Sequence, residues 1–489
     1  EVDVEVDTNL GLPGFEIVGL PDAAVKESKE RVRSAIKNSG RKFPIHKITV
    51  NLAPAELKKE GAGLDLPIAV GIIAANGQLA SADVKAAMIG ELSLDGKIRG
   101  VNGILPILIS AREKGVREMI IPEENSEEGS FIDGITVRAA EDLKSVCDYL
   151  EGKSDLKIVE KKEYAQVYRT AEYDSDLKYV KGQFVARRAL EVAVSGNHNI
   201  ILEGPPGAGK TMLAKCIPSI MPDMSFREAL ETTKIHSVAG KMKDTEGIVY
   251  RRPFMSPHHT ASRVSIIGGG QSAKPGVVSL AHNGVLFLDE MPEYPRSVLE
   301  SLRQPLEDRV ITVTRVKANL EYPASFMLAG SMNPCPCGYY GSKDRECTCS
   351  PTQIKKYRER ISGPLLDRMD IRINVDNVKY DELTDKTEAE SSAEVRKRVN
   401  RTRALQRERF KDDGISSNAE MSEKHLNKYC VLSRECEEIL KYAFESLKMS
   451  ARARSRIIKV ARTIADMDLS ENIEPKHLLE AISYRGDGL

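Results

Sequence analysis

The stretch GPPGAGKT, at residues 204–211, satisfies the pattern G-x-x-x-x-G-K-[ST] and decides the fold of the middle of this chain. It follows the apolar run NIILEG, at residues 199–204, which is typical of a buried strand, and it precedes a helical segment. In a glycine-rich turn between a strand and a helix, backbone N–H groups converge on a phosphate and the helix N-terminus adds positive potential. The predicted nucleotide-binding residues of this phosphate loop are Gly204, Pro205, Pro206, Gly207, Ala208, Gly209, Lys210 and Thr211.

Two further strand ends carry side chains suited to nucleotide chemistry. We predict that Lys210 reaches the β- and γ-phosphates of ATP and that the Thr211 hydroxyl ligates Mg²⁺. The apolar strand GVLFLDE, at residues 284–290, ends in two carboxylates, of which Asp289 is predicted to hold Mg²⁺ and Glu290 to polarise the attacking water. The strand end AGSMNP, at residues 329–334, carries Asn333, whose amide is expected to orient that water or contact the γ-phosphate.

The chain, at 489 residues, is too long for a single core. Strands and helices alternate around the phosphate loop, which predicts an α/β fold with a parallel sheet. We predict an α+β N-terminal domain at residues 1–150, a charged linker at 151–176, an α/β core at 177–378 and a helical C-terminal domain at 379–489.

Composition narrows the classes of partner. Lys plus Arg and Asp plus Glu both number 72, so the net charge is zero and a global basic field for gripping nucleic acid is excluded. Trp is absent and aromatic residues make up 5%, which disfavours base stacking as the main mode of binding. No apolar run approaches the roughly 18–20 residues of a membrane span and no signal peptide is visible, so we expect a cytoplasmic protein without a membrane partner. Because the chain opens inside an alternating strand pattern, we also expect residues before Glu1.

Two groups of side chains raise the question of a metal. Four of the eight cysteines crowd into one short stretch, at Cys335, Cys337, Cys347 and Cys349, and four thiolates suit tetrahedral Zn²⁺. The C-x-C spacing is tighter than the usual C-x₂₋₄-C, so structural zinc and a loop of reduced thiols both remain open. The adjacent His258 and His259 are expected to point to opposite sides of an extended chain, which argues against joint ligation.

Several long blocks resemble one family. Together with the phosphate loop and the acidic strand, they mark an AAA+ ATPase similar to the magnesium-chelatase-like ComM/YifB family. The blocks are GLPGFEIVGLPDAAVKESKERVRSAI (11–36), PFMSPHHTASRVSIIGGG (253–270), KPGVVSLAHNGVLFLDEMPEY (274–294), SMNPCPCGYYG (331–341), ISGPLLDRMDI (361–371) and MSARARSRIIKVARTIADM (449–467). The resemblance covers essentially the whole chain, and Met255 departs from it where a basic residue is expected.

The resemblance implies a P-loop AAA+ core with a C-terminal helical lid, and it assigns three more residues. Arg368 in LLDR matches the arginine finger, supplied in trans to a neighbour's γ-phosphate, Arg452 matches the second sensor of the lid, and Gln183 is expected near the adenine. Arginine suits the first two roles because it stays charged and its fork stabilises charge spread over phosphate oxygens. A finger in trans requires a neighbouring subunit, and the family implies a homo-hexamer.

The same resemblance implies the function. It predicts an ATP-hydrolysing ring motor on single-stranded or branched DNA without sequence preference, serving as a branch-migration helicase in homologous recombination and natural transformation. One alternative is a magnesium-chelatase-type motor subunit, which would not need the N-terminal domain. Another is a protein-remodelling ATPase of Lon type without peptidase activity.

Basic residues near the core are candidates for DNA contact. Residues 309–330 predict two strands joined by a turn, and the resemblance implies a hairpin that projects into the pore and carries Arg315 and Lys317. A solvated hairpin tip without a partner remains the alternative. Four more basic residues are candidates on the same terms: Arg251, Arg252, Arg263 and Lys274. Contacts of these residues with DNA would be electrostatic and sensitive to salt.

The N-terminal domain resembles the Lon peptidase fold through KEGAGLDLPIAVGI (59–72) and GELSLDGKIRGVNGILPI (90–107). A Lon peptidase needs a Ser nucleophile in the first block and a Lys base in the second. The first block contains no Ser, and Leu105 stands near the place where the Lys should fall. We therefore expect a non-catalytic scaffold, a DNA-binding module or an assembly module.

Overall fold

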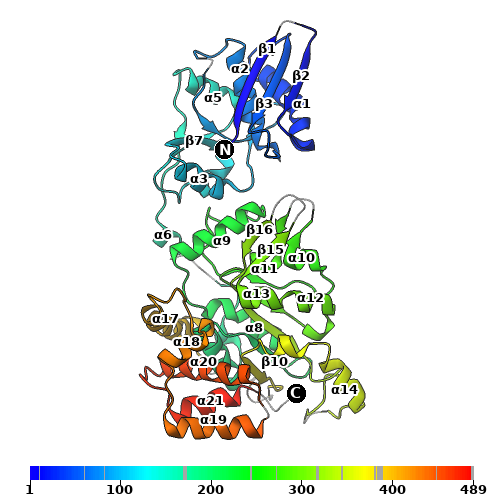
Figure 1. Cartoon of the computed structure of the whole chain (residues 1–489), viewed down its shortest axis with the longest axis vertical. Coiled ribbons are helices and arrows are strands. Elements are labelled where there is room, and N and C mark those ends of the chain that lie inside the picture. The colour runs from blue at the N-terminus through cyan, green and yellow to red at the C-terminus, as the bar shows by residue number, and fades with distance from the viewer. Residues whose placement is uncertain are drawn as a thin grey trace. The chain divides into compact units, whose positions relative to one another are not determined.

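The computed structural model describes residues 1–9, 11–59, 61–81, 83–168, 173–242, 245–270, 273–314, 319–342, 345–378, 382, 389–447 and 449–485. The chain divides into two compact units (Figure 1). Unit 1 contains Glu1–Thr170 and Ala229–Tyr250, and unit 2 contains Ala171–Glu228 and Arg251–Leu489. Both units mix helices with strands, which confirms the predicted α/β content. The domain boundaries at 150, 176 and 378 stay predictions.

The first sheet of unit 1 has three strands. The central β3 (Lys47–Ala53) pairs antiparallel with β1 (Asp3–Asn9) and parallel with β2 (Gly14–Val18). Alternate residues of β3 are fully buried, as the two-residue period of a strand predicts when one face meets a core. That core also contains one face of α1 (Ala23–Asn38) and most of α2 (Asp65–Ala75), so the apolar run of residues 66–75 is a buried helix.

The second sheet of unit 1 has the order β4 (Ala87–Met88), β7 (Glu118–Pro122), β8 (Thr136–Ala140) and β9 (Lys157–Ile158). Residues 1–170 also contain the β5 (Glu91–Leu92)–β6 (Ile98–Arg99) pair and the α-helices α3 (Ile104–Glu113), α4 (Ser126–Gly129), α5 (Leu143–Leu150) and α6 (Tyr164–Tyr168). The segment read as a linker therefore contains β9 and the short α6.

A segment from the middle of the chain completes unit 1. Helix α9 (Phe226–Val238) joins unit 1 from Ala229 onward. The Ser237 hydroxyl donates to the buried carboxylate of Glu128 at 2.5 Å, and its carbonyl accepts from the Gly103 N–H at 3.1 Å. Unit 1 is thus built from two stretches that are separated in the sequence.

Unit 2 is built on a five-stranded parallel sheet. Its order is β11 (Phe254–Met255), β14 (Val285–Leu288), β17 (Met327–Met332), β10 (Ile200–Glu203) and β18 (Ile371–Asn374). Successive residues of β14 enter different cores: Val285 and Phe287 join one cluster, and Leu286 and Leu288 join the other. Both faces of the strand are buried, and such strands read as continuous apolar runs in the sequence.

Helices cover both faces of this sheet. One core is shared with the C-terminal helices, which gather at one end of unit 2 in Figure 1. Among the described residues, the α-helices wholly within unit 2 are α7 (Phe184–Gly196), α8 (Lys210–Ile220), α10 (Arg263–Ile267), α11 (Val277–Leu280), α12 (Arg296–Ser301), α13 (Arg303–Asp308), α14 (Pro351–Arg358), α15 (Gly363–Leu366), α17 (Ser392–Arg409), α18 (Glu423–Tyr429), α19 (Arg434–Ser446), α20 (Ala451–Met467) and α21 (Pro475–Ser483).

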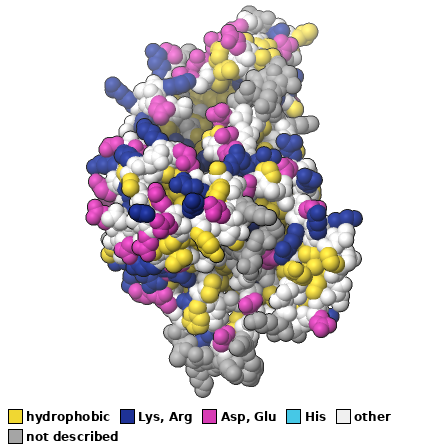
Figure 2. Space-filling view, turned by 60° about the horizontal axis from the view of Figure 1, so that its bottom comes forward, with side chains coloured by type: hydrophobic (Ala, Val, Ile, Leu, Met, Phe, Trp, Pro, Cys, Tyr) yellow, Lys and Arg dark blue, Asp and Glu magenta, His cyan; other side chains and the backbone are white. Residues whose placement is uncertain are grey.

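Two antiparallel hairpins leave the core of unit 2. One pairs β12 (Gly268–Gly269) with β13 (Lys274–Pro275), and the other pairs β15 (Val310–Thr314) with β16 (Asn319–Pro323), which confirms the two predicted strands. Figure 2 shows Lys and Arg side chains interspersed with Asp and Glu on the face it displays, as the zero net charge leads one to expect. Among the described residues, none of the helices combines the length and apolarity needed to span a membrane.

Candidate functional site

The strand order of unit 2 brings the predicted nucleotide residues to one edge of the sheet. The phosphate loop follows the end of β10, Asp289 and Glu290 follow β14, and Asn333 follows β17. Because β17 lies between the other two strands, Asn333 emerges between the phosphate loop and the acidic pair. In parallel sheets the carboxyl ends of strands form the ligand-binding edge. We call this edge, defined by these residues, the carboxyl edge.

The phosphate loop joins β10 to α8, and Lys210 is the first residue of that helix. Gly209 precedes it with φ 86°, a left-handed conformation that a side chain would strain. The Lys210 amine is buried and donates to the carbonyls of Gly204 and Pro205 and to Oδ1 of Asn333, at 2.8, 2.8 and 3.1 Å. Burial lowers the pKa of Lys210, while the charges of Asp289 and Glu290 oppose that shift. The amine is therefore held at the loop, beside the γ-phosphate sensor that the sequence predicts.

Hard oxygen donors converge beside the first turn of α8. The Thr211 hydroxyl donates to Oδ2 of Asp289 at 2.8 Å, so the two side chains predicted to share Mg²⁺ are in contact. The other carboxylate oxygen of Asp289 accepts a short hydrogen bond from the hydroxyl of Ser331, a buried residue of β17. Hydroxyl and carboxylate oxygens are the donors that Mg²⁺ prefers, so this pair fits the ion. Ser331 was missed in the sequence, although it lies within the quoted strand end AGSMNP.

Glu290 presents an exposed carboxylate from an unusual backbone. Its φ is 49°, and its N–H donates to Oδ1 of Asp289 and to Oγ of Ser331, both at 3.1 Å. Non-glycine residues in this region are uncommon and cluster at functional sites. The neighbouring hydrogen bonds fix the direction in which the side chain leaves the sheet.

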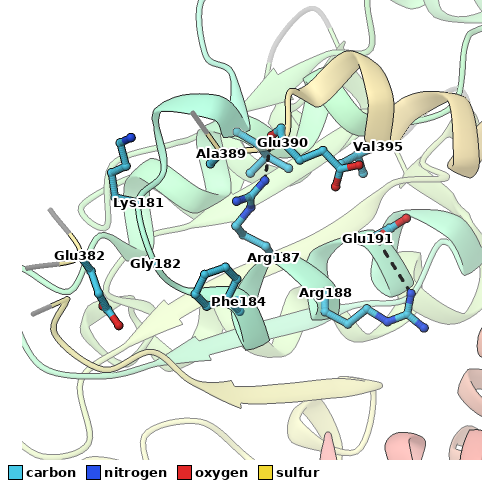
Figure 3. A pocket seen from close by; sticks show the side chains of 11 residues that line it. Lys181, Gly182, Phe184, Arg187, Arg188, Glu191, Glu382, Ala389, Glu390 and Val395 are labelled. Atoms are coloured by element: carbon cyan, nitrogen blue, oxygen red, sulfur yellow. Dashed lines mark hydrogen bonds and ion pairs between the residues drawn. The ribbon is translucent and has the colours of Figure 1, made fainter. Parts of the chain in front are cut away.

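Gln183 connects the phosphate loop to a cavity. It has φ 53° and its amide donates to the carbonyls of Ala208 and Asp376, at 3.2 and 2.6 Å. The residues on either side of it line a cavity of about 560 Å³, together with Arg187 of α7, whose guanidinium bonds the carbonyl of Glu390 (Figure 3). This volume lies in the range of small-molecule pockets. The cavity therefore offers space for a base beside the phosphate loop.

The predicted arginine finger lies at the opposite edge of the same sheet, which we call the amino edge. Arg368 precedes β18, and its carbonyl accepts from the Asn199 amide at 2.9 Å, directly before β10. Since β10 has four residues at about 3.3 Å each, roughly 13 Å of strand separates Arg368 from the phosphate loop of its own chain. A single chain therefore does not bring this arginine to its own site.

Arg368 is held by neighbours that the sequence did not reveal. It is 6% exposed and forms a short ion pair with Glu307 of α13, while a second guanidinium nitrogen donates to the Pro364 carbonyl at 2.6 Å. Its Nε is buried and has no hydrogen-bond partner among the described residues. Burial lowers the pKa of Arg368, Glu307 opposes the shift, and nearby positive charges add to it, including that of Arg452.

Arg452 thus lies near Arg368 rather than beside the phosphate loop. It is exposed in the first turn of α20, and Arg456, one turn later, donates to Oδ1 of buried Asp370 at 2.9 Å. Asp370 also accepts from the Asn199 N–H at 3.0 Å, so the helix is tied to the start of β10. The two arginines assigned from the resemblance therefore share the amino edge.

The four clustered cysteines follow Asn333 in the sequence, beginning two residues after it. Their sulfur atoms are all within 4.8 Å of one another, and the structure contains them as free thiols. The cluster is compatible with zinc. The expected opposite orientation of the paired histidines was wrong, because the rings of His258 and His259 have centroids only 4.1 Å apart. Among the described residues, the cysteines are the only group of three or more candidate ligands close enough to hold a metal.

The structure removes one basic residue from the DNA candidates. Arg252 is 7% exposed, its guanidinium pairs with Glu228 at 3.1 Å, and it donates to the Asn283 carbonyl at 2.7 Å. It is a structural residue because burial and these bonds leave it no free face. Arg315 and Lys317 lie outside the described residues.

The two positions at which a Lon peptidase would carry its catalytic Ser and Lys hold neither of these residues in this chain. The block at 59–72 lies on η1 (Ala62–Leu64) and α2, and its helical part is mostly buried and is apolar apart from Asp65, which pairs with Arg31 at 2.7 Å. Leu105 is 1% exposed in α3 and packs in an apolar cluster. The geometry therefore gives unit 1 no nucleophile and base at these positions.

Known proteins resemble this chain along its length. The family model described as magnesium chelatase, subunit ChlI, matches residues 176–383, subunit ChlI of Mg-chelatase matches 4–125, and the ChlI C-terminal model matches 389–485. The protein YifB of Salmonella typhimurium is 43% identical over 487 residues, and the competence protein ComM of Haemophilus influenzae is 42% identical over 489 residues; each alignment covers 99% of this chain and 94% of the relative. Lon protease 2 of Bacillus subtilis is 31% identical over 124 residues, which are 25% of this chain and 22% of that protein. Matches of this extent and identity establish that the chain belongs to the magnesium-chelatase-like ComM/YifB family.

Proposed function

We propose that this chain is an ATP-hydrolysing motor that works as a ring of identical subunits, most simply a hexamer, on single-stranded or branched DNA. The observation that carries the proposal is the separation of two half-sites on one sheet. Lys210, Asp289 and Glu290 stand at the carboxyl edge, and Arg368 and Arg452 stand at the amino edge. A second copy that offers its amino edge to the first copy's carboxyl edge completes the pocket, and a ring lets every copy do both.

The carboxyl edge supplies the groups that ATP and Mg²⁺ require. Lys210 would neutralise the outer phosphates, Thr211 and Asp289 would hold the ion, and Glu290 would accept a proton from water. When bound, Mg²⁺ neutralises charge on the phosphate oxygens. Asn333 bonds Lys210 at 3.1 Å and so lies where it can report the presence of the γ-phosphate.

DNA is proposed as the load because a whole-chain relative carries the name competence protein ComM. Branch migration during recombination and natural transformation is the activity that we assign to it. A chelatase motor is the second candidate, favoured by the descriptions of the family models. The N-terminal domain does not separate the two, contrary to our expectation, because residues 4–125 also match a model described as a chelatase subunit.

The test compares ATP hydrolysis with and without a branched DNA, an unfolded protein, or a porphyrin with Mg²⁺. We expect stimulation by DNA that falls steeply with salt, because the contacts are electrostatic. We also expect the wild type to move a fluorescent three-strand junction and Lys210→Ala to leave it in place. Lys215→Ala, an exposed residue of the same helix, serves as the matched control. Hydrolysis without junction movement would reject the DNA motor, and metal insertion into the porphyrin would favour the chelatase.

A further inference from the structure

The cysteine loop, residues 335–349, begins two residues after Asn333 and ends at the N-terminus of α14. Its described residues form no regular helix or strand, which is unusual for a connection of this length inside a compact unit. Ordered loops of this kind need their own source of stability, since fixing each residue costs about 1–2 kcal/mol of conformational entropy. The four thiols are the candidate source of that stability, because together they can bind a metal ion.

We propose that Cys335, Cys337, Cys347 and Cys349 bind one structural Zn²⁺, and that this metal clamps the loop against the phosphate loop. Three sulfur pairs are 3.3, 3.7 and 3.6 Å apart: Cys335 with Cys337, Cys335 with Cys347, and Cys337 with Cys347. Zn–S bonds of about 2.3 Å in a tetrahedron place sulfurs about 3.8 Å apart, close to these values. A disulfide requires about 2.05 Å, so the sulfurs are arranged around a shared point rather than bonded in pairs.

The surroundings of the sulfurs also fit bound thiolates. The backbone N–H of Cys349 donates to Sγ of Cys347 at 3.4 Å, and the N–H of Tyr339 donates to Sγ of Cys337. In each case the donor lies two residues after the acceptor: for Cys347 it belongs to the same C-x-C pair, and for Cys337 it lies just beyond the pair. Such outer-shell donors orient ligands and stabilise their charge. One sulfur of each C-x-C pair is therefore supported by a nearby backbone N–H.

The loop touches the phosphate loop directly. Gly338, at φ 86°, lies so close to Pro206 that a side-chain Cβ would stand 2.5 Å from the proline ring. Arg358, the last residue of the helix α14 that follows the loop, bonds Glu203 at 2.9 Å and the Pro334 carbonyl at 3.3 Å. Glu203 is the last residue of β10 before the phosphate loop. An ordered cysteine loop therefore helps to fix the end of β17, which carries Asn333, and the end of β10, which leads into the phosphate loop.

The claim that the cysteines bind zinc does not depend on the proposed function. The claim that zinc supports nucleotide binding rests on it. We would purify the full chain without chelator and measure zinc per chain by elemental mass spectrometry. Wild type and Cys436→Ser, which alters a buried thiol outside the cluster, are expected to hold one zinc, and Cys347→Ser/Cys349→Ser to hold none. Co²⁺ in place of zinc should give the absorption of a tetrahedral thiolate site. A wild-type chain with no zinc and no Co²⁺ uptake overturns the site.

Binding of a fluorescent ATP analogue then tests the clamp. We expect zinc loss to raise the dissociation constant by about ten-fold, which corresponds to about 1.4 kcal/mol. Chelated wild type, and the same sample after Zn²⁺ is restored, give this comparison without a substitution and so remain informative if the double variant fails to fold. Unchanged affinity after zinc removal rejects the coupling. Failure of the zinc-loaded wild type to bind nucleotide rejects the proposed function and leaves the metal site standing.

Discussion

Glu290 shows how one residue can be positioned by its neighbours rather than by its own preference. A left-handed backbone costs a non-glycine residue on the order of 1–3 kcal/mol, and two hydrogen bonds of its N–H hold it there. The sequence identifies the carboxylate at a strand end, but the backbone that aims it depends on Ser331 of another strand. The place of Glu290 in the sequence was predictable, whereas the direction in which its side chain points was not.

Replacing Glu290 by Gln should therefore separate binding from hydrolysis. The amide keeps the size of the side chain but accepts no proton from water, so we expect phosphate release to fall on the order of 100-fold while the affinity for a fluorescent ATP analogue stays within two-fold, roughly. Glu293→Gln, a nearby exposed carboxylate paired with Arg360, is the control. Hydrolysis at the wild-type rate in Glu290→Gln would assign the base elsewhere.

Glu228 carries a testable dependence of stability on pH. Burial alone would raise its pKa, but Arg252 and the Ser225 backbone N–H lower the pKa to about 2. Because this folded value lies below the ordinary one, the carboxylate stabilises the fold above about pH 4.5 and loses that effect as the pH falls toward 2. We expect Glu228→Gln to cost about 2 kcal/mol near pH 7, allowing for partial exposure, and less near pH 4. Melting temperatures at both pH values check this, and a constant difference between variant and wild type contradicts it.

At the scale of elements, helices α17 and α20 are joined by a buried charge network. Asp466 is 1% exposed and accepts from Arg409 of α17, from Arg462 one turn earlier, and from the Asn418 amide. Breaking one member of a buried pair leaves the other charge without compensation, so Asp466→Asn should destabilise unit 2 by about 3 kcal/mol. The midpoint of urea unfolding, followed by circular dichroism, measures the loss. Glu438→Gln, from the exposed pair with Arg434, should change the midpoint little, and equal effects would contradict the argument.

Elements governed by local pattern were predictable from the sequence. β10 and β14 lie within the predicted apolar runs. The candidate site was predictable where residues follow a strand directly, as Asp289 and Asn333 do, and where they belong to the phosphate-loop pattern, as Lys210 does. Long-range partners were not, because no local pattern marks Glu307 as the partner of Arg368 or Arg358 as that of Glu203. The resemblance assigned Arg452 a role, but only the fold places it near Arg368.

At the scale of the whole molecule, the two half-sites predict complementation between inactive variants. Arg368→Ala keeps its own phosphate loop, and Lys210→Ala keeps its arginine. Each alone should hydrolyse little ATP, but in an equal mixture about one quarter of the contacts would pair an intact phosphate loop with an intact finger. Steady-state hydrolysis of the mixture should rise well above either variant alone. If it equals their average, the arginine does not act between subunits.

The stretch Ala229–Tyr250 has a consequence for how the polypeptide can be cut. The chain leaves unit 2 after Glu228 and returns at Arg251, so the two units are joined by three crossings of the backbone rather than one. A protease that cleaves once between residues 150 and 176 gives two fragments, and the N-terminal fragment then stays with the rest only through noncovalent contacts such as that of Ser237 with Glu128. A fragment ending at residue 170 also loses the Ser237 hydroxyl that bonds Glu128 and exposes a buried carboxylate, so separate expression of residues 1–170 should yield an unstable polypeptide.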